Sequence, residues 1–408
     1  MLAPLLSVRT LLAAIFLLMA GSGFLSTLIA VRLEQSGASA LTIGIVGTAY
    51  FGGLMAGSLR VPAMIAQIGH IRAFAACVTV FSASSLAYAL ALDPITWSLL
   101  RFIDGVAIAG VFVCLESWLN RQAAAQSRSM VLAAYMVFLY GGQALGQFLL
   151  NLGQDRPDLP FMLSAILLSL ALLPVVLTRL EQPAVEAIAP FSLKRLYSAS
   201  PLGIVGVVLN GAILGAFYAL GAVYVQRIGM ELSQVALFTS CVIGGGVALQ
   251  TPLGLLSDRF DRRRVIVGCF MAVTAICAVM AFLPLPQIAL FALGAVFGGF
   301  AFALYPLCVA HSNDHLGENE RLSASSGLVL AYSAGAVAGP MLGSVGMTAF
   351  GAPGLFMLIG GLALIGTVFG LTRMVVAAPV DAEDQQAYRG LPRTSPMVAV
   401  LEVEAERE

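Results

Sequence analysis

The chain has 408 residues, of which 59% are hydrophobic and 10% charged, and its formal net charge is zero. A soluble domain has roughly 45–50% apolar and about 25% charged residues, so this composition excludes an ordinary soluble globular protein. It indicates an integral membrane protein, because a bilayer-spanning helix needs about 20 mainly apolar residues and runs of that length recur along the chain.

Charged residues and Pro or Gly breaks divide the chain into twelve predicted spans, six in each half. In chain order the spans cover residues 10–31, 42–65, 73–92, 95–118, 130–152, 161–178, 202–225, 233–256, 265–284, 287–310, 324–348 and 354–374. Six cysteines lie within these apolar runs without a paired spacing, so we expect them to pack as small hydrophobic residues. We therefore predict an all-α integral membrane protein with twelve transmembrane helices.

The spans group into a predicted N-terminal bundle of residues 1–179 and a C-terminal bundle of residues 201–374. Residues 180–200 link them. Apolar and basic residues alternate within the linker, which is typical of a short helix in the lipid headgroup layer but also fits a plain tether: Phe191, Leu193, Lys194, Arg195, Leu196 and Tyr197. Residues 375–408 are acidic and interrupted by proline, which predicts a disordered tail.

The two predicted bundles match each other at a constant offset of 192 or 193 residues. The matched pairs are Gly37 and Gly229, Gly52–Gly53 and Gly244–Gly245, Asn120 and Asn313, Arg128 and Arg321, and Gly146 and Gly339. A chain that repeats itself in one register over this length is expected to fold as two similar halves.

A basic connection between the eighth and ninth spans, Gly254–Arg264, reads Gly-Leu-Leu-Ser-Asp-Arg-Phe-Asp-Arg-Arg-Arg. It resembles the signature loop of the major facilitator superfamily, Gly-x-x-x-Asp-Arg-x-Gly-Arg-Arg. The equivalent first-half stretch, Pro62–Arg72, carries Ala66 and Gln67 where the motif has its acid and first basic residue. The loop motif is therefore intact only in the second half.

Three further stretches support the resemblance. Arg101 to Gly105 resembles the family's Arg-x-x-x-Gly motif on the fourth helix. Gly335 to Gly343 resembles its Gly-x-x-x-Gly-Pro-x-x-Gly-Gly motif, which is usual on the fifth helix but lies here on the eleventh. Tyr305 to Asp314, with the polar residues beyond it, looks like the YcaD-like branch of the superfamily.

The resemblance implies two six-helix bundles, related by a pseudo-twofold axis, that rock about a substrate site near mid-membrane. It also implies a gate at the inner end of the second half. The residues expected to form this gate or latch are Gly254, Asp258, Arg259, Asp261, Arg262, Arg263, Asn313 and Asp314. The basic residues can in addition bind anionic lipid headgroups or only fix the topology.

Gly335, Gly339 and Gly343 lie four residues apart, on one helix face. Small residues at this spacing let helices approach closely in lipid, and Pro340 removes a backbone donor that a straight helix would use. The motif is interpreted either as helix packing or as a hinge for rocking.

Buried charge is the strongest functional signal, because an ionisable residue inside a span is costly to insert. Arg101 and Asp104 lie three residues apart and share a helix face, so they can pair; Glu116 lies further towards the inner side. In one interpretation the pair only braces the helix. In the other, which we favour, it faces the central cavity and Asp104 exchanges a proton. Glu116 is a candidate for coupling or a partner of Arg121 or Arg128.

Neutral polar residues inside other spans are candidates for a cavity lining, because polar groups at membrane depth face protein or water. They are Tyr135, Tyr140, Gln143, Gln147, Asn210, Tyr218, Gln250, Tyr305 and Tyr332. Singly, each is as well explained by a hydrogen bond between helices.

We expect a monomeric secondary transporter that moves a small organic solute, coupled to protons, with efflux preferred over uptake. A non-transporting receptor or scaffold of the same fold is the alternative from another class, and an enzyme, a cofactor, a metal site or a nucleic-acid partner is not expected. Most of the 21 Lys and Arg residues fall on the side of the N-terminus. This bias predicts a bacterial-type inner membrane location with both termini in the cytoplasm.

Overall fold

The computed structural model describes residues 3–90, 92–123, 127–178, 183, 192–376, 385–386, 388, 390 and 393–395. The described residues form helices, and twelve of these spans are long and apolar enough to cross a membrane, which confirms the predicted all-α class. In the first half the elements are α1 (Ala3–Ser22), α2 (Leu25–Gln35), α3 (Ala40–Ile68), α4 (His70–Ala87), α5 (Pro94–Gln122), α6 (Arg128–Gly146), the 3₁₀-helix η2 (Gln147–Gly153) and α7 (Leu159–Val176).

The second half begins after a short linker helix, and its spans follow the order predicted from the sequence. The linker helix is α8 (Leu193–Ala199), and the spans are α9 (Pro201–Arg227), α10 (Leu232–Arg259), α11 (Arg262–Phe282), α12 (Gln287–Asn313), α13 (Glu318–Phe350) and α14 (Gly354–Val376). In α8, Leu196 is buried while Lys194, Arg195 and Tyr197 are exposed. Phe191 lies outside the described residues.

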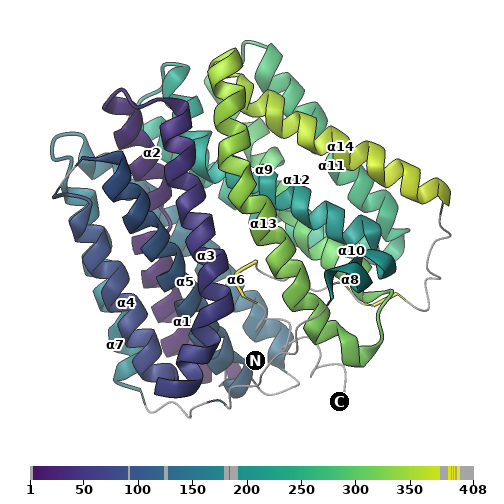
Figure 1. Ribbon diagram of the computed structural model, residues 1–408, viewed down its shortest axis with the longest axis horizontal. Helices are drawn as coiled ribbons and strands as arrows, with labels where there is room; N and C mark the ends of the chain where they lie inside the picture. The colour runs from purple at the N-terminus through teal and green to yellow at the C-terminus, as the bar shows by residue number, and fades with distance from the viewer. Residues whose placement is uncertain are drawn as a thin grey trace.

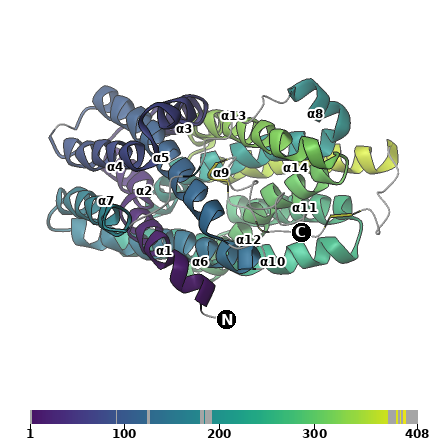
Figure 2. The same cartoon turned by 90° about the horizontal axis from the view of Figure 1, so that it is seen from below.

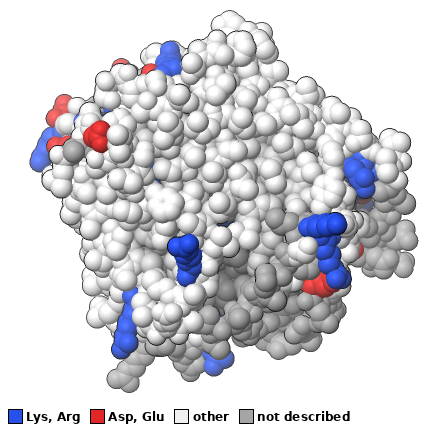
Figure 3. Space-filling model, in the orientation of Figure 1, with Lys and Arg blue, Asp and Glu red and all other residues white. Residues whose placement is uncertain are grey.

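The halves lie side by side, with α1 to α7 in one group and α9 to α14 in the other (Figures 1 and 2). They touch through α3 against α13, α2 against α9, and α6 and η2 against α10. On the face shown in Figure 3, charged side chains lie mostly towards the edges, the upper middle is uncharged, and basic side chains also appear further in on the lower part. This distribution suits a protein surrounded by lipid.

The first span consists of two helices rather than one, since the chain turns between Ser22 and Leu25. A side chain at Gly23 would press on the carbonyl oxygen of Met19 at 2.5 Å and on Cγ of Gln143 at 2.8 Å. Gln147 donates its side-chain amide to the Gly23 carbonyl at 3.1 Å, which satisfies an acceptor that the turn exposes. The break therefore depends on α6 packing against it.

The internal repeat recurs in the way the helices cross. In the first half, α3 and α5 are so close that a Cβ on Gly53 would overlap the carbonyl oxygen of Phe102. In the second half, α10 and α12 make the same crossing, where a Cβ on Gly245 would overlap the carbonyl oxygen of Ala295. Gly53 corresponds to Gly245, and Phe102 to Ala295, at the same sequence offset that relates the two halves.

A second crossing repeats in the same register. A Cβ on Gly146 of α6 would lie 2.5 Å from the carbonyl oxygen of Ala20 in α1, and one on Gly339 of α13 would lie 2.3 Å from that of Ala212 in α9. The turn glycines also agree, because Gly37 and Gly229 have positive φ values of 80° and 89°, which a residue with a side chain rarely adopts. The sequence repeat thus reflects two halves built on the same backbone contacts.

Candidate functional site

The connections between spans lie on two opposite faces of the molecule. The signature-loop face carries the connection between α10 and α11 around Asp261, and the opposite face carries the connection between α9 and α10 near Arg227. On the opposite face, Arg227 of the second half forms a two-pronged ion pair with Glu34 of the first half, with N–O distances of 2.8 and 2.9 Å.

Deeper in the molecule, two hydrogen bonds also join the halves. Thr48 donates to the carbonyl oxygen of Val337 at 3.1 Å, and Ser240 donates to that of Ala144 at 2.8 Å. Pro340 lies against Gly44 and Gly47 of α3, where a Cβ would be within 2.8 to 3.3 Å of its backbone or ring. The halves are therefore in close contact on the side of the opposite face.

The ion pair between Glu34 and Arg227 predicts a small, measurable coupling. Because both side chains are partly exposed, a double-mutant cycle with Glu34→Gln and Arg227→Gln should give about 0.5–1 kcal/mol. The measurement is unfolding by sodium dodecyl sulfate in mixed micelles. Exchanging the charges, with Glu34→Arg and Arg227→Glu together, should restore most of the loss caused by either reversal alone. A coupling of zero would show that the contact does not help to hold this face closed.

On the signature-loop face, Arg262 is the centre of a charged cluster and is 1% exposed. Its Nη1 donates to both oxygens of Asp314 at 2.7 Å, and its Nη2 donates to Asp258 at 3.0 Å. Burial raises the pKa of the Asp314 carboxyl above its ordinary value, and the Arg262 charge offsets part of this rise. The cluster ties the start of α11 to the ends of α10 and α12.

The neighbouring gate residues have separate partners. Asp261 caps α11 by accepting from the backbone N–H of Arg263 at 3.0 Å, and it pairs with the Arg263 side chain at 2.8 Å. Although burial of Asp261 tends to raise its pKa, the bonds from Arg263 leave that pKa below its usual value. Asn313 is buried at the end of α12 and Arg259 is exposed. The motif is thus held together within the second half.

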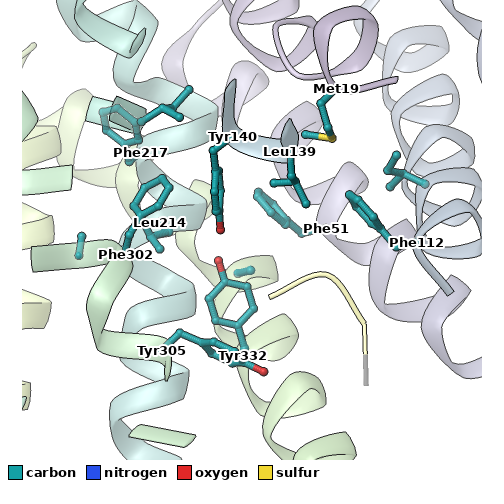
Figure 4. Packing of buried hydrophobic residues seen from close by; sticks show 14 of the residues in the cluster. Met19, Phe51, Phe112, Leu139, Tyr140, Leu214, Phe217, Phe302, Tyr305 and Tyr332 are labelled. Atoms are coloured by element: carbon teal, nitrogen blue, oxygen red, sulfur yellow. The ribbon is translucent and has the colours of Figure 1, made fainter. Parts of the chain in front are cut away.

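A central cavity of about 120 Å³ lies between the halves. Its lining combines apolar side chains such as Met19, Phe51 and Phe112 with four of the polar residues predicted from the sequence, namely Tyr140, Gln143, Tyr218 and Tyr332. The hydroxyl groups of Tyr140 and Tyr332 point towards each other across this region (Figure 4). The cavity offers aromatic faces and a few hydrogen-bonding groups, which is usual for a small-molecule site.

The other predicted lining residues are not among those that border this cavity. Gln147 holds the Gly23 turn, Asn210 donates to the carbonyl oxygen of Ala301 at 2.7 Å, and Tyr135 donates to Glu116 at 2.8 Å. Tyr305 packs edge-on against Tyr332, and Gln250 lies beside Gly390. Apart from the contact of Gln250 with the tail, these contacts are those expected of hydrogen bonds and packing between neighbouring elements.

Arg101 and Asp104 do form a buried pair, with Arg101 Nη1 3.6 Å from Asp104 Oδ2. Arg101 borders a small cavity next to the central one, donates to Ser26 at 2.6 Å and lies over the ring of Tyr50. Asp104 is 0% exposed and accepts from Tyr88 of the α4 end at 2.6 Å. Only Arg101 reaches a cavity lining, so Asp104 departs from the expectation that both members of the pair face the cavity.

Glu116 is also fully buried, but it points to a different place. It lies one helical turn beyond the cavity-lining Phe112 on α5, so both side chains lie on nearly the same helix face. Among the described residues its hydrogen-bond donors are the hydroxyl groups of Tyr135, Thr394 and Ser395. Of the two alternatives for Glu116, pairing with Arg121 or Arg128 gives way to contacts with three hydroxyl groups.

Residues of the C-terminal tail enter the site, which the sequence pattern did not indicate. The backbone N–H groups of Gln386 and Tyr388 donate to Asp314 and Asp258, each at 2.9 Å, and Arg262 donates to the Gln386 carbonyl oxygen at 2.6 Å. Arg393 and Thr394 border the central cavity. The expectation of disorder covered residues 375–408, of which most lie outside the described residues.

The glycine motif of α13 divides its contacts between the halves. Gly335 and Gly339 pack against α9 of the same half, where any Cβ would press on backbone carbonyl oxygens. Pro340 lies next to them and touches α3 of the first half. Helix α13 runs through Pro340 without interruption. Packing is therefore visible at this motif, and its role as a hinge stays a prediction.

Two repeated helical halves, twelve membrane-crossing spans and a cavity between the halves define a membrane transporter of the two-bundle class. The profile of the Major Facilitator Superfamily matches residues 11–248 and 216–401, which together cover most of the chain. The chain belongs to this superfamily of secondary transporters, whose members are not enzymes, and it is a multi-pass integral membrane protein.

Similar sequences and structures agree with this assignment. The chain is 28% identical to the MFS-type transporter YcaD of Escherichia fergusonii over 362 residues, which covers 88% of this chain and 93% of the relative. It is also 28% identical to YcaD of Salmonella typhimurium over 363 residues, again covering 88% and 93%. These matches agree with the resemblance to the YcaD-like branch.

Among solved structures, the nucleoside transporter NupG superposes with a TM-score of 0.75 at 15% identity, covering 90% of this chain and 98% of that one. A bacterial homologue of the human lysosomal transporter Spinster, in an inward-facing and unoccupied conformation, gives 0.74 at 17% identity, covering 94% and 98%. At these identities the likeness shows the fold alone.

Proposed function

We propose that the protein moves a small organic solute by alternating access, with the central cavity as its binding site. The observation that carries this proposal is the asymmetry of the contacts between the halves. They are joined directly by Glu34, Thr48 and Ser240 on the side of the opposite face. Towards the signature-loop face, described tail residues lie between them at the cavity. This arrangement is expected of a transporter that is closed on one side of the membrane.

We further propose that the signature-loop face is cytoplasmic and that the membrane is a bacterial-type inner membrane. The basic residues Arg259, Arg262, Arg263 and Arg264 lie together at this face, and cytoplasmic connections are enriched in Lys and Arg. In this orientation the opposite face is closed to the outside. A solute that leaves the cell would then enter the cavity from the cytoplasm, which favours efflux over uptake.

Protons are the proposed driving ion, and Glu116 is the best placed carboxyl group to carry them. It lies next to the cavity residue Phe112 and is surrounded by hydroxyl groups that can donate to its charged form or, by turning, accept from its protonated form. Asp104 is buried behind Arg101 and accepts a hydrogen bond from Tyr88. We assign the pair of Arg101 and Asp104 a supporting role, in which it sets the position of α5.

The test is a solute screen in proteoliposomes with a pH-sensitive dye in the lumen, comparing wild type with Glu116→Gln and Asp104→Asn. Wild-type flux should change the lumenal pH. Glu116→Gln should lose at least about 90% of the flux driven by a pH gradient, because an amide cannot exchange a proton, and keep solute exchange without a gradient. Asp104→Asn should keep its coupling per folded molecule.

Three outcomes would each contradict part of the proposal. Coupling that is unchanged in Glu116→Gln and absent in Asp104→Asn would move the proton to the buried pair. A fully folded wild-type protein that moves none of the screened solutes, while deletion of the tail abolishes a cellular effect, would favour a receptor or scaffold. Net uptake in vesicles of known orientation would reverse the assigned direction.

A further inference from the structure

The described tail residues that precede the cavity, Gln386 and Tyr388, are anchored to the signature-loop face. Tyr388 packs its ring directly on Gly254, the first residue of the signature loop, so that any side chain at Gly254 would overlap this ring. Its N–H and that of Gln386 occupy carboxylate oxygens of Asp258 and Asp314. The anchoring groups therefore belong to the second half and to the signature loop itself.

Further along the tail, Arg393 contacts both halves. The guanidinium carbon of Arg393 lies 4.3 Å from the ring centroid of Phe302 and 5.8 Å from that of Tyr332, both in the second half. Its Nη2 donates to the Tyr140 hydroxyl of the first half at 3.4 Å. A cation over aromatic faces is attracted by their electron density, and more strongly where water is excluded.

The next two residues complete the contact with the first half. The hydroxyl groups of Thr394 and Ser395 donate one to each carboxylate oxygen of Glu116. Ser395 is itself buried, at 3% exposure. In Figure 4 the short yellow trace of these residues runs between Tyr332 and Phe112. The segment thus fills the place in which a bound solute would contact Tyr140, Tyr332 and Glu116.

We propose that Arg393, Thr394 and Ser395 are an internal ligand of the central cavity, and that the solute able to displace them is an organic cation bearing hydroxyl groups. The inference rests on the proposed transport function, since displacement presupposes a cavity that fills and empties. A tethered ligand acts at a high effective concentration, so it lowers the apparent affinity for any free ligand by the fraction of time that it occupies the site.

The chemistry of the contacts sets the ligand class. The aromatic faces of Phe302 and Tyr332 and the hydroxyl of Tyr140 accept a positive charge. Glu116 accepts two hydroxyl donors and is fully buried when they are present. A neutral apolar solute would leave this carboxylate with the Tyr135 hydroxyl as the one remaining donor of the three described, which is costly for a buried charged group. A displacing solute must therefore supply both a cation and donors.

The first test measures access to the cavity with the variant Ser22→Cys, because Ser22 borders the cavity and its hydroxyl donates to the carbonyl oxygen of Leu18 in its own helix. Labelling by a water-soluble maleimide is followed by mass spectrometry in three chains: full length, truncated after Val376, and truncated after Met397. The first truncation should label at least ~10-fold faster than full length. The second is the matched control, because it keeps Arg393 to Ser395, and should label like full length.

The second test measures binding of a capped peptide of residues 385–395 to the chain truncated after Val376, by calorimetry. The peptide should bind, replacement of Arg393 by citrulline should weaken it at least ~10-fold, and the full-length chain should bind it at least ~10-fold more weakly than the truncated chain. If the truncated chain does not fold, the triple variant Arg393→Ala, Thr394→Ala, Ser395→Ala in the full chain replaces it in both tests.

Equal labelling of all three chains, or equal binding of the arginine and citrulline peptides, would overturn the proposal. Neither readout requires transport, so a failure here is distinct from a failure of alternating access. Conversely, a protein that labels and binds as expected but moves no solute would keep the internal ligand and remove the proposed function.

Discussion

Replacing Gly53 or Gly245 with valine is expected to prevent the accumulation of folded protein. At both positions the new Cβ would overlap a backbone carbonyl oxygen of the facing helix, that of Phe102 in the first half and of Ala295 in the second. Backbone in a packed helix cannot move aside as a flexible side chain can, so the cost should exceed the 1–3 kcal/mol or so typical of overpacking. The measurement is the yield of monodisperse protein by size-exclusion chromatography, followed by thermal unfolding.

The chain supplies matched controls in the preceding residues. Gly52 and Gly244 lie next to the two critical glycines, but beyond the neighbouring turns of its own helix no described atom lies within 4 Å of a Cβ built on either. Their replacement by valine should change stability by less than about 0.5 kcal/mol. If all four variants fold equally well, the close crossings of α3 with α5 and of α10 with α12 do not stabilise the halves in which they lie.

The second large effect is expected for Arg262→Ala. The change would leave Asp314, which is itself buried, without its cation, and breaking one side of a buried ion pair costs about 3–5 kcal/mol. The measurement is unfolding by sodium dodecyl sulfate in mixed micelles. Arg264→Ala is the control, because Arg264 is exposed on the same helix, and it should change stability by less than about 0.5 kcal/mol.

Replacing both Arg262 and Asp314 distinguishes the loss of their attraction from the cost of leaving one charge buried without a partner. The double variant Arg262→Ala, Asp314→Ala should be more stable than Arg262→Ala alone, since no unpaired charge then remains buried. A double variant as unstable as the single one would show that Arg262 acts through Asp258 or through the Gln386 carbonyl oxygen.

The repeat could be predicted from sequence because it depends on residues with few substitutes. Gly53 and Gly245 allow a helix crossing, and Gly37 and Gly229 adopt positive φ. Such positions tolerate little else, so they keep their register in both halves. The twelve spans were predictable for a similar reason, since length and apolarity alone decide whether a helix can cross a membrane.

The orientation of polar side chains was harder to predict from the sequence. Spacing predicts that Arg101 and Asp104 can pair, but it does not tell which neighbouring helix each one faces. Asp104 is paired with Tyr88, a contact decided by how α4 packs on α5. Tyr140 and Gln143 reach the cavity, whereas Gln147, directly after the same helix, is used to hold a turn in the first span.

The tail contacts could not be predicted because they depend on partners far away in sequence. Arg393, Thr394 and Ser395 lie in a polar segment whose composition suggests disorder. Their aromatic and carboxylate partners, Phe302 and Glu116, are brought together only when the halves meet. Because the segment is short and has no periodic pattern, its sequence does not indicate where it binds.

Alternating access is tested most directly by pulsed electron paramagnetic resonance on two spin-labelled pairs in a cysteine-free background. One pair, Ser36→Cys with Ile228→Cys, spans the halves on the opposite face, and the other, Gln67→Cys with Arg259→Cys, spans them on the signature-loop face; all four residues are exposed. When pH is lowered or the tail is removed, one distance should lengthen as the other shortens. Two distances that stay fixed under every condition would contradict the rocking of the halves.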